Sequence, residues 1–431
     1  MNKYKQTLKK LYSLTTKWYN NILYWVVGSF LAAILTGRIL NRLKMSQHFS
    51  QQIKARLLCP FAVIVVFIFA PIFTQSSTGW YYFMLVTLCV IAYNEQDSLP
   101  KLFKAIENQV YDHKKIELVL VDNGSTDNTK NVMENFSNNS DFFDVRVISR
   151  TRGNQAQGWN TALLNTKGNI IIKVDAHAII PEDFVKNNVE VMSEGEFVCG
   201  GGRPNLPMQD KPWDNTLLAA EECMFGGSYA KYRSPQTKNE YINSIFNGAY
   251  RREVFARVGG FNEALGRTED NEFHYRVTKA GYKICCSPKI TSYQYIRSSL
   301  PKMIKQKYSN GYWIGLTAKT CPQCLSLFHF VPFAFVMALL IFGAFALCAV
   351  TLPLAVMLAA YFLFDCFITF NAFRSGKVCV QFLLLPFIFP LLHISYGIGT
   401  LVGILHLPIR KDNLNSAKRR IREVKHYYLE N

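Results

Sequence analysis

Residues 84–95 read MLVTLCVIAYNE, an apolar run rich in β-branched side chains that ends abruptly in polar ones. A continuous apolar run of this length is typical of a strand that is buried on both faces of a sheet. The next segment, 98–110, places four apolar side chains at helical spacing, and Ser98 with Pro100 can start that helix. The two segments together predict the first strand and helix of a βαβ unit.

The alternation of strand and helix continues downstream. The segment 116–125, IELVLVDNGS, indicates a second buried strand that turns at its Asn-Gly pair, and 127–136 indicates a second helix. Two further strands are expected at 145–150 and 169–176. This order predicts an α/β fold with a mostly parallel, Rossmann-like sheet, in which ligands bind beyond the carboxyl ends of the strands.

Polar side chains stand at four of these strand ends, at 94–95, 122–123, 150–154 and 175–177. No G-x-G-x-x-G or Walker A pattern follows any of the strands, so a dinucleotide site or a P-loop would lack its phosphate cradle. Asp175 and His177 are two residues apart on an extended chain, so both can point toward one divalent ion. An isolated Asp-x-His pair is more often a solvated strand end, but its place in this series favours a metal site.

Three motifs at these intervals, IAYNE, VDNGSTDNT and VDAHA, resemble the family 2 glycosyltransferases, which have a GT-A nucleotide-binding domain. The resemblance is in particular to the membrane-attached branch of exopolysaccharide enzymes that includes the succinoglycan glucosyltransferases. Three later stretches support it: FNGAYRREVFARVGGFNE, RTEDNEFHYRVTKAGYKI and IRSSLPKMIKQKYSNGYW. The similarity covers about residues 84–320, and the first 80 residues show no resemblance.

The resemblance implies a nucleotide-sugar site formed by eight residues at the first three strand ends: Ala92, Tyr93, Asn94, Glu95, Asp122, Asp127, Arg152 and Asn154. The segment 92–95 would form the wall against which the base lies. Asp122 would accept a hydrogen bond from the uracil or the ribose, and Asp127 would brace the loop that follows. Arg152 and Asn154 would lie near the donor.

The resemblance also implies a metal site. Asp175 and His177 would take the place of the Asp-x-Asp motif of the family and would bind Mn²⁺ or Mg²⁺ together with the diphosphate of the donor. Imidazole in place of the second carboxylate keeps a ligand but removes a negative charge. Because Mn²⁺ tolerates a nitrogen ligand better than Mg²⁺ does, this exchange bears on which ion is bound. Lys173 is expected to flank the strand and need not be catalytic.

Glu269-Asp270 has the form of the acceptor-side motif of the family. Asp270 is the expected base that takes the proton of the acceptor hydroxyl, with inversion at the anomeric carbon, and Glu269 is the alternative. Arg297 is placed to stabilise the leaving diphosphate. Processive synthases carry Q-x-x-R-W at this point, but here Ser298 replaces the tryptophan, which favours the addition of a single sugar over translocation.

Composition divides the chain into four expected parts: a basic region with one or two membrane-associated apolar segments (1–80), a cytoplasmic GT-A domain (83–320), transmembrane or re-entrant helices (325–407) and a basic cytoplasmic tail (408–431). Two bilayer spans are expected at about 327–349 and 352–371. The stretch 379–407 contains two prolines and the polar sequence HISYG, which suggest a broken or re-entrant hairpin.

The net charge of +18 indicates an anionic partner. Nucleic acid is not expected, because the charge lies largely beside the apolar segments and no known nucleic-acid module is present. The sequence therefore predicts a membrane-bound, inverting glycosyltransferase at the cytoplasmic face of the cell membrane. It would move a sugar from a nucleotide-sugar, expected to be UDP-linked, to a lipid-linked or polysaccharide acceptor in surface polysaccharide or glycolipid synthesis. The alternative is a non-catalytic membrane scaffold or export subunit that keeps the nucleotide-binding fold.

Overall fold

The computed structural model describes residues 84–223, 231–233, 236–374, 379–406 and 409–431. The chain divides into two units, Met1–Tyr81 and Tyr82–Asn431, and the described residues all belong to the second. The apolar segments expected within residues 1–80 therefore lie outside the described residues.

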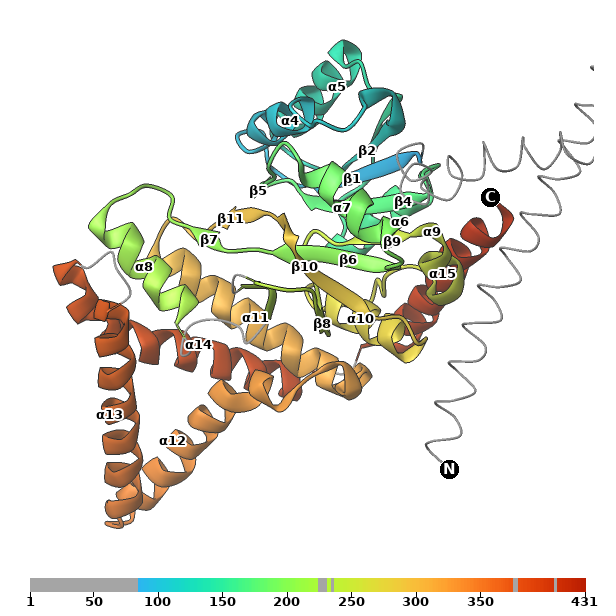
Figure 1. Cartoon of the computed structure of the whole chain (residues 1–431). Coiled ribbons are helices and arrows are strands. Elements are labelled where there is room, and N and C mark those ends of the chain that lie inside the picture. The colour runs from blue at the N-terminus through green and yellow to red at the C-terminus, as the bar shows by residue number, and fades with distance from the viewer. Residues whose placement is uncertain (1–83, 224–230, 234–235, 375–378, 407–408) are drawn as a thin grey trace, which may run out of the picture. The chain divides into compact units, whose positions relative to one another are not determined.

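The second unit contains an eight-stranded sheet with the order β3-β2-β1-β4-β9-β6-β10-β8 (Figure 1). Its strands are β1 (Val86–Ala92), β2 (Ile116–Asp122), β3 (Asp144–Ser149), β4 (Ile170–Asp175), β6 (Val198–Gly202), β8 (Glu240–Ile242), β9 (Ala249–Arg251) and β10 (Ile284–Thr291). Pairing is parallel from β3 through β4 and between β6 and β10, whereas β9 and β8 pair antiparallel with their neighbours. The prediction of a mostly parallel α/β sheet is confirmed.

A smaller sheet of three strands lies beside the main one in the order β5-β11-β7. These strands are β5 (Ala178–Ile179), β11 (Tyr293–Tyr295) and β7 (Asn205–Leu206). β11 pairs antiparallel with β5 and parallel with β7. The small sheet therefore brings the segment around Gln294 next to the end of β4, more than a hundred residues earlier in the chain.

The helices of the domain cover the sheets. They are α4 (Leu99–Glu107), α5 (Thr129–Asn139), α6 (Gln155–Leu163), α7 (Phe184–Ser193), α8 (Pro212–Glu222), α9 (Arg252–Val258) and α10 (Glu269–Lys279), with short 3-10 turns η1 (His113–Lys115) and η2 (Lys231–Arg233). In α4 the four buried residues are the apolar ones at helical spacing that predicted the helix.

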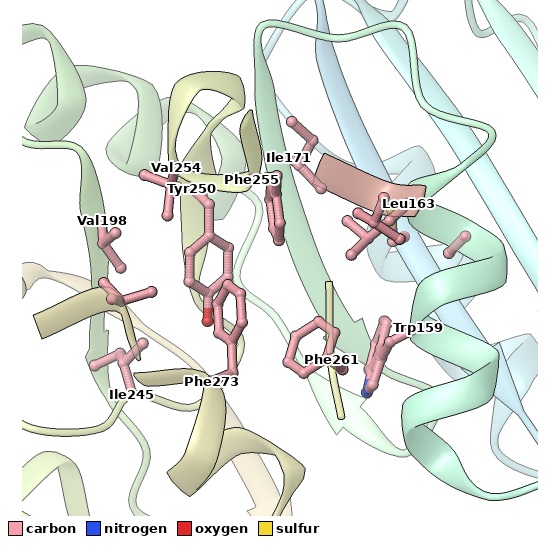
Figure 2. Close-up of a cluster of buried hydrophobic side chains, with 14 of the residues drawn as sticks. Trp159, Leu163, Ile171, Val198, Ile245, Tyr250, Val254, Phe255, Phe261 and Phe273 are labelled. Atoms are coloured by element: carbon pink, nitrogen blue, oxygen red, sulfur yellow. The ribbon is translucent and has the colours of Figure 1, made fainter. Parts of the chain in front are cut away.

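Aromatic side chains fill the core between the sheet and the helices that cover it. Figure 2 shows Tyr250 of β9, Phe255 of α9 and Phe273 of α10 close together, and beside them Trp159 of α6 next to Phe261, which lies in the segment that joins α9 to α10. All five side chains are almost fully buried. Rings of this size bury a large apolar area each, so this cluster fixes α10 against the sheet.

The domain continues into a series of long helices. These are α11 (Leu300–Thr320), α12 (Val331–Leu347), α13 (Leu352–Arg374), α14 (Leu385–Leu405) and α15 (Lys411–Glu430), with 3-10 turns η3 (Pro322–Cys324), η4 (Leu327–Phe330) and η5 (Val380–Leu384). Among the described residues, three segments are long and apolar enough to cross a membrane: Leu327–Leu347, Leu352–Arg374 and Val380–Leu405. The broken hairpin expected over 379–407 is instead a 3-10 turn followed by one helix, which continues through Pro390.

The third of these apolar segments differs from the other two in its packing. In its most apolar stretch 39% is buried against the protein, compared with 6% and 17% for the first two. Figure 1 shows α14 alongside α11, whereas α12 and α13 extend away from the sheet. Glycines allow α11 and α14 to touch: a Cβ added at Gly311 would lie 2.0 Å from the backbone oxygen of Tyr396, and one added at Gly403 would lie 2.1 Å from that of Tyr312.

The last helix, α15, returns to the domain that contains the sheets. Val424 and Tyr428 belong to the same buried cluster as the aromatic core. The Tyr428 hydroxyl shares a hydrogen bond of 2.6 Å with the hydroxyl of Thr166, and Arg420 forms an ion pair with Glu263 at 3.3 Å. The basic tail, expected to be cytoplasmic or to lie on acidic lipid, is thus an integral element of the domain.

Candidate active site

The register of the sheet brings the polar strand ends to one edge. Ala92 pairs with Asp122, which in turn pairs with Ser149. On the other side of β1, Ile91 pairs with Asp175. Because the strands are parallel, all their carboxyl ends face the same way, and the polar residues that follow them share one crevice.

Hydrogen bonds fasten the loops after β1 and β2 to each other. Asn94, with a positive φ of 54°, accepts the backbone N–H of Thr126 at 2.9 Å and donates its own to Ser125 Oγ at 3.0 Å. Asp127 accepts the backbone N–H of Gln96 at 3.3 Å. Asp127 therefore joins the two loops, and its role toward a bound nucleotide remains a prediction.

Four of the residues expected at the nucleotide lie at the ends of β1 and β2 or in the loops that follow β1 and β3. Ala92 and Asp122 are buried at paired strand ends, and Asp122 Oδ1 accepts the backbone N–H of Ser125 at 3.0 Å. Tyr93 is exposed, and the guanidinium of Arg152 lies 5.0 Å from the centre of its ring. The exposed aromatic face and its cation are suited to a planar base and a nearby phosphate.

Asn154 has its side chain engaged within the protein. It caps α6, with Oδ1 accepting the backbone N–H of Gln157 at 3.0 Å and Nδ2 donating to the backbone oxygen of Glu263 at 2.6 Å. This arrangement gives Asn154 a structural role at the rim of the crevice. Its neighbour Asn123 accepts from Arg150 Nη1 at 2.6 Å and so links the loops after β2 and β3.

His177 is held at both ring nitrogens. Its Nδ1 lies 3.3 Å from Glu95 Oε1, and its Nε2 lies 2.6 Å from Nε2 of Gln294. The Oε1 of Gln294 accepts a hydrogen bond from buried Arg203. That bond leaves the NH₂ group of Gln294 to donate to His177, so the hydrogen-bond network assigns the neutral tautomer with the proton on Nδ1.

The charges around His177 raise its pKa, so they favour the protonated ring, whereas the hydrogen bond with Gln294 favours the neutral ring. Burial opposes the charge, but the hydrogen bond to Glu95 and the charges of Asp175 and Glu95 outweigh it and raise the pKa of His177. Burial alone would raise the pKa of Glu95, but the hydrogen bond with His177 and the charge of Arg297 lower it. A proton on Nε2 would face the NH₂ of Gln294, so protonation requires that amide to turn.

Asp175 is the residue that fits a cation. The described residues contain no group of three or more His, Cys, Asp or Glu side chains placed to hold a metal. Within the same part of the chain no donor bonds the Asp175 carboxylate, although its backbone N–H bonds Asn247 Oδ1 at 3.1 Å. Burial raises the pKa of Asp175, which a bound divalent ion would offset. One or two protein ligands suffice for an ion that a diphosphate also binds, and His177 could join only by releasing Gln294.

The two acids of the acceptor-side motif differ in environment. Both stand in the first turn of α10, where negative charge suits the helix dipole. Glu269 is buried, and burial together with the charge of Asp270 raises the pKa of Glu269 to about 8. The side chain of Asp270 is 32% exposed, and its Oδ1 lies 2.5 Å from Nζ of Lys173. At neutral pH, Glu269 therefore holds its proton, which favours Asp270 as the base.

Arg297 lies in the turn between β11 and α11, close enough for its charge to act on Glu95 and His177. Burial and the charge of Arg297 also lower the pKa of Arg267, whose Nη1 donates to Ser309 Oγ at 3.3 Å. Two guanidinium groups so close to each other attract an anion, as a diphosphate site requires.

Sequence reasoning missed three residues of this crevice. Lys173 was expected to flank its strand, but it lies inside with 5% of its surface exposed. A lone lysine within an apolar strand, two residues before Asp175, was the signal for it. Arg203 and Asn247 are also buried and contact Gln294 and Asp175, respectively. Neither carries a recognisable local signal, because each reaches the site through a long-range contact.

The sequence model described as Glycosyl transferase family 2 matches residues 87–259, which hold β1 to β4 and the strand-end motifs. These residues are a family 2 glycosyltransferase domain. The resemblance noted from the motifs is thereby confirmed, and the matched residues hold the strands of the main sheet other than β10.

Two curated relatives illustrate the range of similar proteins. A dolichyl N-acetyl-α-D-glucosaminyl phosphate 3-β-D-2,3-diacetamido-2,3-dideoxy-β-D-glucuronosyltransferase of Methanococcus voltae is 27% identical over 316 residues, covering 67% of this chain and 96% of its own length. The succinoglycan biosynthesis protein ExoA of Rhizobium meliloti is 26% identical over 201 residues, covering 45% of this chain and 58% of its own length. Both alignments support a glycosyltransferase.

Among solved structures, the mannosyltransferase PcManGT from Pyrobaculum calidifontis, in complex with GDP-Man and Mn²⁺, superposes with a TM-score of 0.50. It is 20% identical, and the match covers 74% of this chain and 87% of that one. At this identity the likeness concerns the fold of the glycosyltransferase domain and its continuation.

Proposed function

We propose that this chain transfers a single sugar, with inversion, from a nucleotide-sugar to a lipid-linked acceptor at the membrane surface. UDP-sugars are the first donors to test. The observation that carries the proposal is the placement of Asp270. Through Lys173 of β4, its partly exposed carboxylate is held at the edge of the sheet where Asp175 ends the same strand.

The residues of the crevice divide the chemistry between them. Asp270 would take the proton of the acceptor hydroxyl as it attacks the anomeric carbon, and attack from the face opposite the nucleotide inverts that centre. Arg297 would meet the charge that develops on the departing diphosphate. Asp175, with His177 beside it, would hold the divalent cation, Mn²⁺ or Mg²⁺. When bound, that cation would neutralise part of the negative charge of the diphosphate.

The class of acceptor is supported by the Methanococcus relative, whose name specifies a dolichyl phosphate-linked sugar. A membrane acceptor also suits a domain from which α12 and α13 extend. Because both curated relatives are named for biosynthesis or transfer, synthesis of a surface polysaccharide or glycolipid is favoured over a non-catalytic scaffold.

We further propose that, of the three apolar segments in the described residues, α12 and α13 cross the bilayer and α14 does not. Since α15 packs on the core of the domain through Val424 and Tyr428, the chain after α14 would lie on the same side of the membrane as the sheet. An even number of crossings must therefore separate α11 from α15. With α12 and α13 as the two crossings, α14 stays on the domain side against α11, and its outer apolar face, including Phe387 and Leu391, lies in the membrane interface. The domain side would be cytoplasmic, where nucleotide-sugars are available.

The test uses membranes that contain the full chain, a panel of UDP- and GDP-linked sugars with Mn²⁺, and a polyprenyl phosphate-linked acceptor. We expect one donor to yield a lipid product one sugar heavier, with turnover reduced about 10²- to 10⁴-fold in Asp270→Asn. Glu107→Gln, an exposed carboxylate at the end of α4, is the matched control. Wild-type turnover in Asp270→Asn would refute the proposed base, and product formation with no nucleotide-sugar would refute the donor class.

A further inference from the structure

Lys173 is a buried charged group that holds Asp270 but has no step of its own in the proposed mechanism. It lies in the interior of β4, where its neighbours in the strand are isoleucine and valine, and only 5% of its surface is exposed. Burying an ammonium group is costly unless other groups compensate for the lost water. The compensation at this site is specific and involves three different elements of the fold.

Two aromatic rings and one carboxylate surround the ammonium. Its Nζ lies 4.5 Å from the ring of Trp159 in α6 and 4.5 Å from the ring of Phe261, and each ring face attracts the cation. Its Nζ also donates to Asp270 Oδ1 at 2.5 Å. Trp159 and Phe261 are themselves almost fully buried, so this cradle leaves Lys173 little freedom to move. Figure 2 shows these two rings facing each other in the core.

The ion pair fixes one oxygen of Asp270 and leaves the other available. No donor within the described part of the chain bonds Oδ2, and the side chain is 32% exposed toward the crevice. Asp175 and Glu269 add further acidic groups nearby. The buried ammonium thus offsets the negative charge of Asp270 and sets the direction in which the free oxygen of Asp270 points.

We infer that Lys173 is a positioning residue for sugar transfer, which acts through Asp270 and contacts neither substrate. The inference rests on the proposed function, because it assumes that Asp270 is the base. The aromatic cradle fixes the ammonium, the ammonium fixes Oδ1, and Oδ2 is presented to the acceptor hydroxyl. A catalytic group displaced by about 1 Å loses on the order of 10²-fold in rate.

A double-mutant cycle on the full-length enzyme tests this inference, with Lys173→Met and Asp270→Asn measured singly and together. We expect Lys173→Met to lower kcat about 10²-fold, and donor KM to stay within about twofold of wild type. In the Asp270→Asn background, Lys173→Met should have no further effect, because its target is already absent. Losses that multiply in the double variant, or a higher donor KM with unchanged kcat, would overturn the inference.

The same cycle separates the two proposals. If Asp270→Asn turns over like wild type, the proposed base is wrong. If Asp270→Asn is inactive while Lys173→Met turns over like wild type, the base stands and the positioning role fails.

A second pair of variants keeps the inference testable if Lys173→Met does not fold. Phe261→Leu removes one wall of the cradle but keeps Lys173, and Phe255→Leu changes an equally buried ring of the same cluster that does not face the ammonium. We expect kcat to fall about tenfold or more in Phe261→Leu and to fall much less in Phe255→Leu at similar thermal stability. Equal losses of kcat in both would show that packing alone matters.

Discussion

At His177 the chain carries an imidazole between Glu95 and Gln294, at the position where the family pattern has a second carboxylate. Both nitrogens already have partners in the protein, whereas the carboxylate of Asp175 has no hydrogen-bond donor in the described part of the chain. The two halves of the Asp-x-His motif therefore differ in their readiness to bind an ion.

We expect Asp175→Ala to weaken Mn²⁺ binding by about tenfold or more in the presence of nucleoside diphosphate, and His177→Ala to weaken it several-fold less. The physical reason is that His177 must give up Gln294 before it can bind an ion directly. Electron paramagnetic resonance of free and bound Mn²⁺ measures both affinities, with His177→Asp as a variant that restores a carboxylate. Equal losses in the two alanine variants would show that His177 is a direct ligand.

The buried Glu269 predicts a pH effect on stability. Burial and the charge of Asp270 raise the pKa of Glu269 to about 8 in the folded protein, whereas the pKa of a glutamate in an unfolded chain is about 4.3. Between these values the folded state holds a proton that the unfolded chain has released, so stability falls as pH rises through this window. We expect the Tm of wild type to decrease from pH 5 to about 8 more than the Tm of Glu269→Gln, whose amide cannot ionise. Parallel Tm curves for the two proteins would contradict this assignment.

Several site residues could be predicted from sequence because each stands directly after a buried strand. Parallel pairing then places Asp122 and Asp175 at one edge without any further information. The contacts of Lys173, Arg203 and Asn247 could not be predicted, since their partners lie far away along the chain. The role of Asn154 as a helix cap was also missed, although the capping pattern with Gln157 is present in the sequence.

At the scale of elements, the contact of α11 with α14 depends on glycines whose missing side chains let two backbones touch. We expect Gly403→Ala to destabilise the protein by about 1–3 kcal/mol, because the new methyl group would overlap the backbone oxygen of Tyr312. Gly343→Ala in α12 is the matched control, since a Cβ there meets nothing within 4 Å. Alanine should be neutral there or stabilise by up to about 1 kcal/mol. Thermal unfolding in detergent measures both, and equal shifts would show that the interface is not close-packed.

The elements themselves were predicted with different success. Periodicity predicted β1, β2, α4 and the first two apolar helices correctly, because the spacing of apolar residues along the chain reflects which faces of an element are buried. Periodicity did not predict that α14 packs against α11, and the two prolines of that segment suggested a hairpin instead of one helix. Pro386 lies in the first turn of α14, where a backbone N–H would have no partner within the helix in any case. Pro390 lies inside α14, and the helix continues past it.

At the scale of the whole described unit, the docking of α15 on the core constrains the proposed membrane topology. We expect a reporter fused after α15 and a reporter inserted before α8 to lie on one side, and a reporter inserted between α12 and α13 to lie on the other. Phosphatase and fluorescent-protein fusions distinguish the two sides. If the fusion after α15 reports the side opposite to the domain, α14 is a third crossing and the parity argument fails.

The docking of α15 also bears on how the enzyme is made. Tyr428 and Val424 complete a core that otherwise consists of residues from the glycosyltransferase domain, and they are synthesised after α12, α13 and α14. The ribosome therefore delivers the final core residues only once the apolar hairpin has emerged and can enter the bilayer. Under the proposed topology, a molecule whose hairpin is misinserted would carry α15 to the opposite side of the membrane, and its core would lack Val424 and Tyr428.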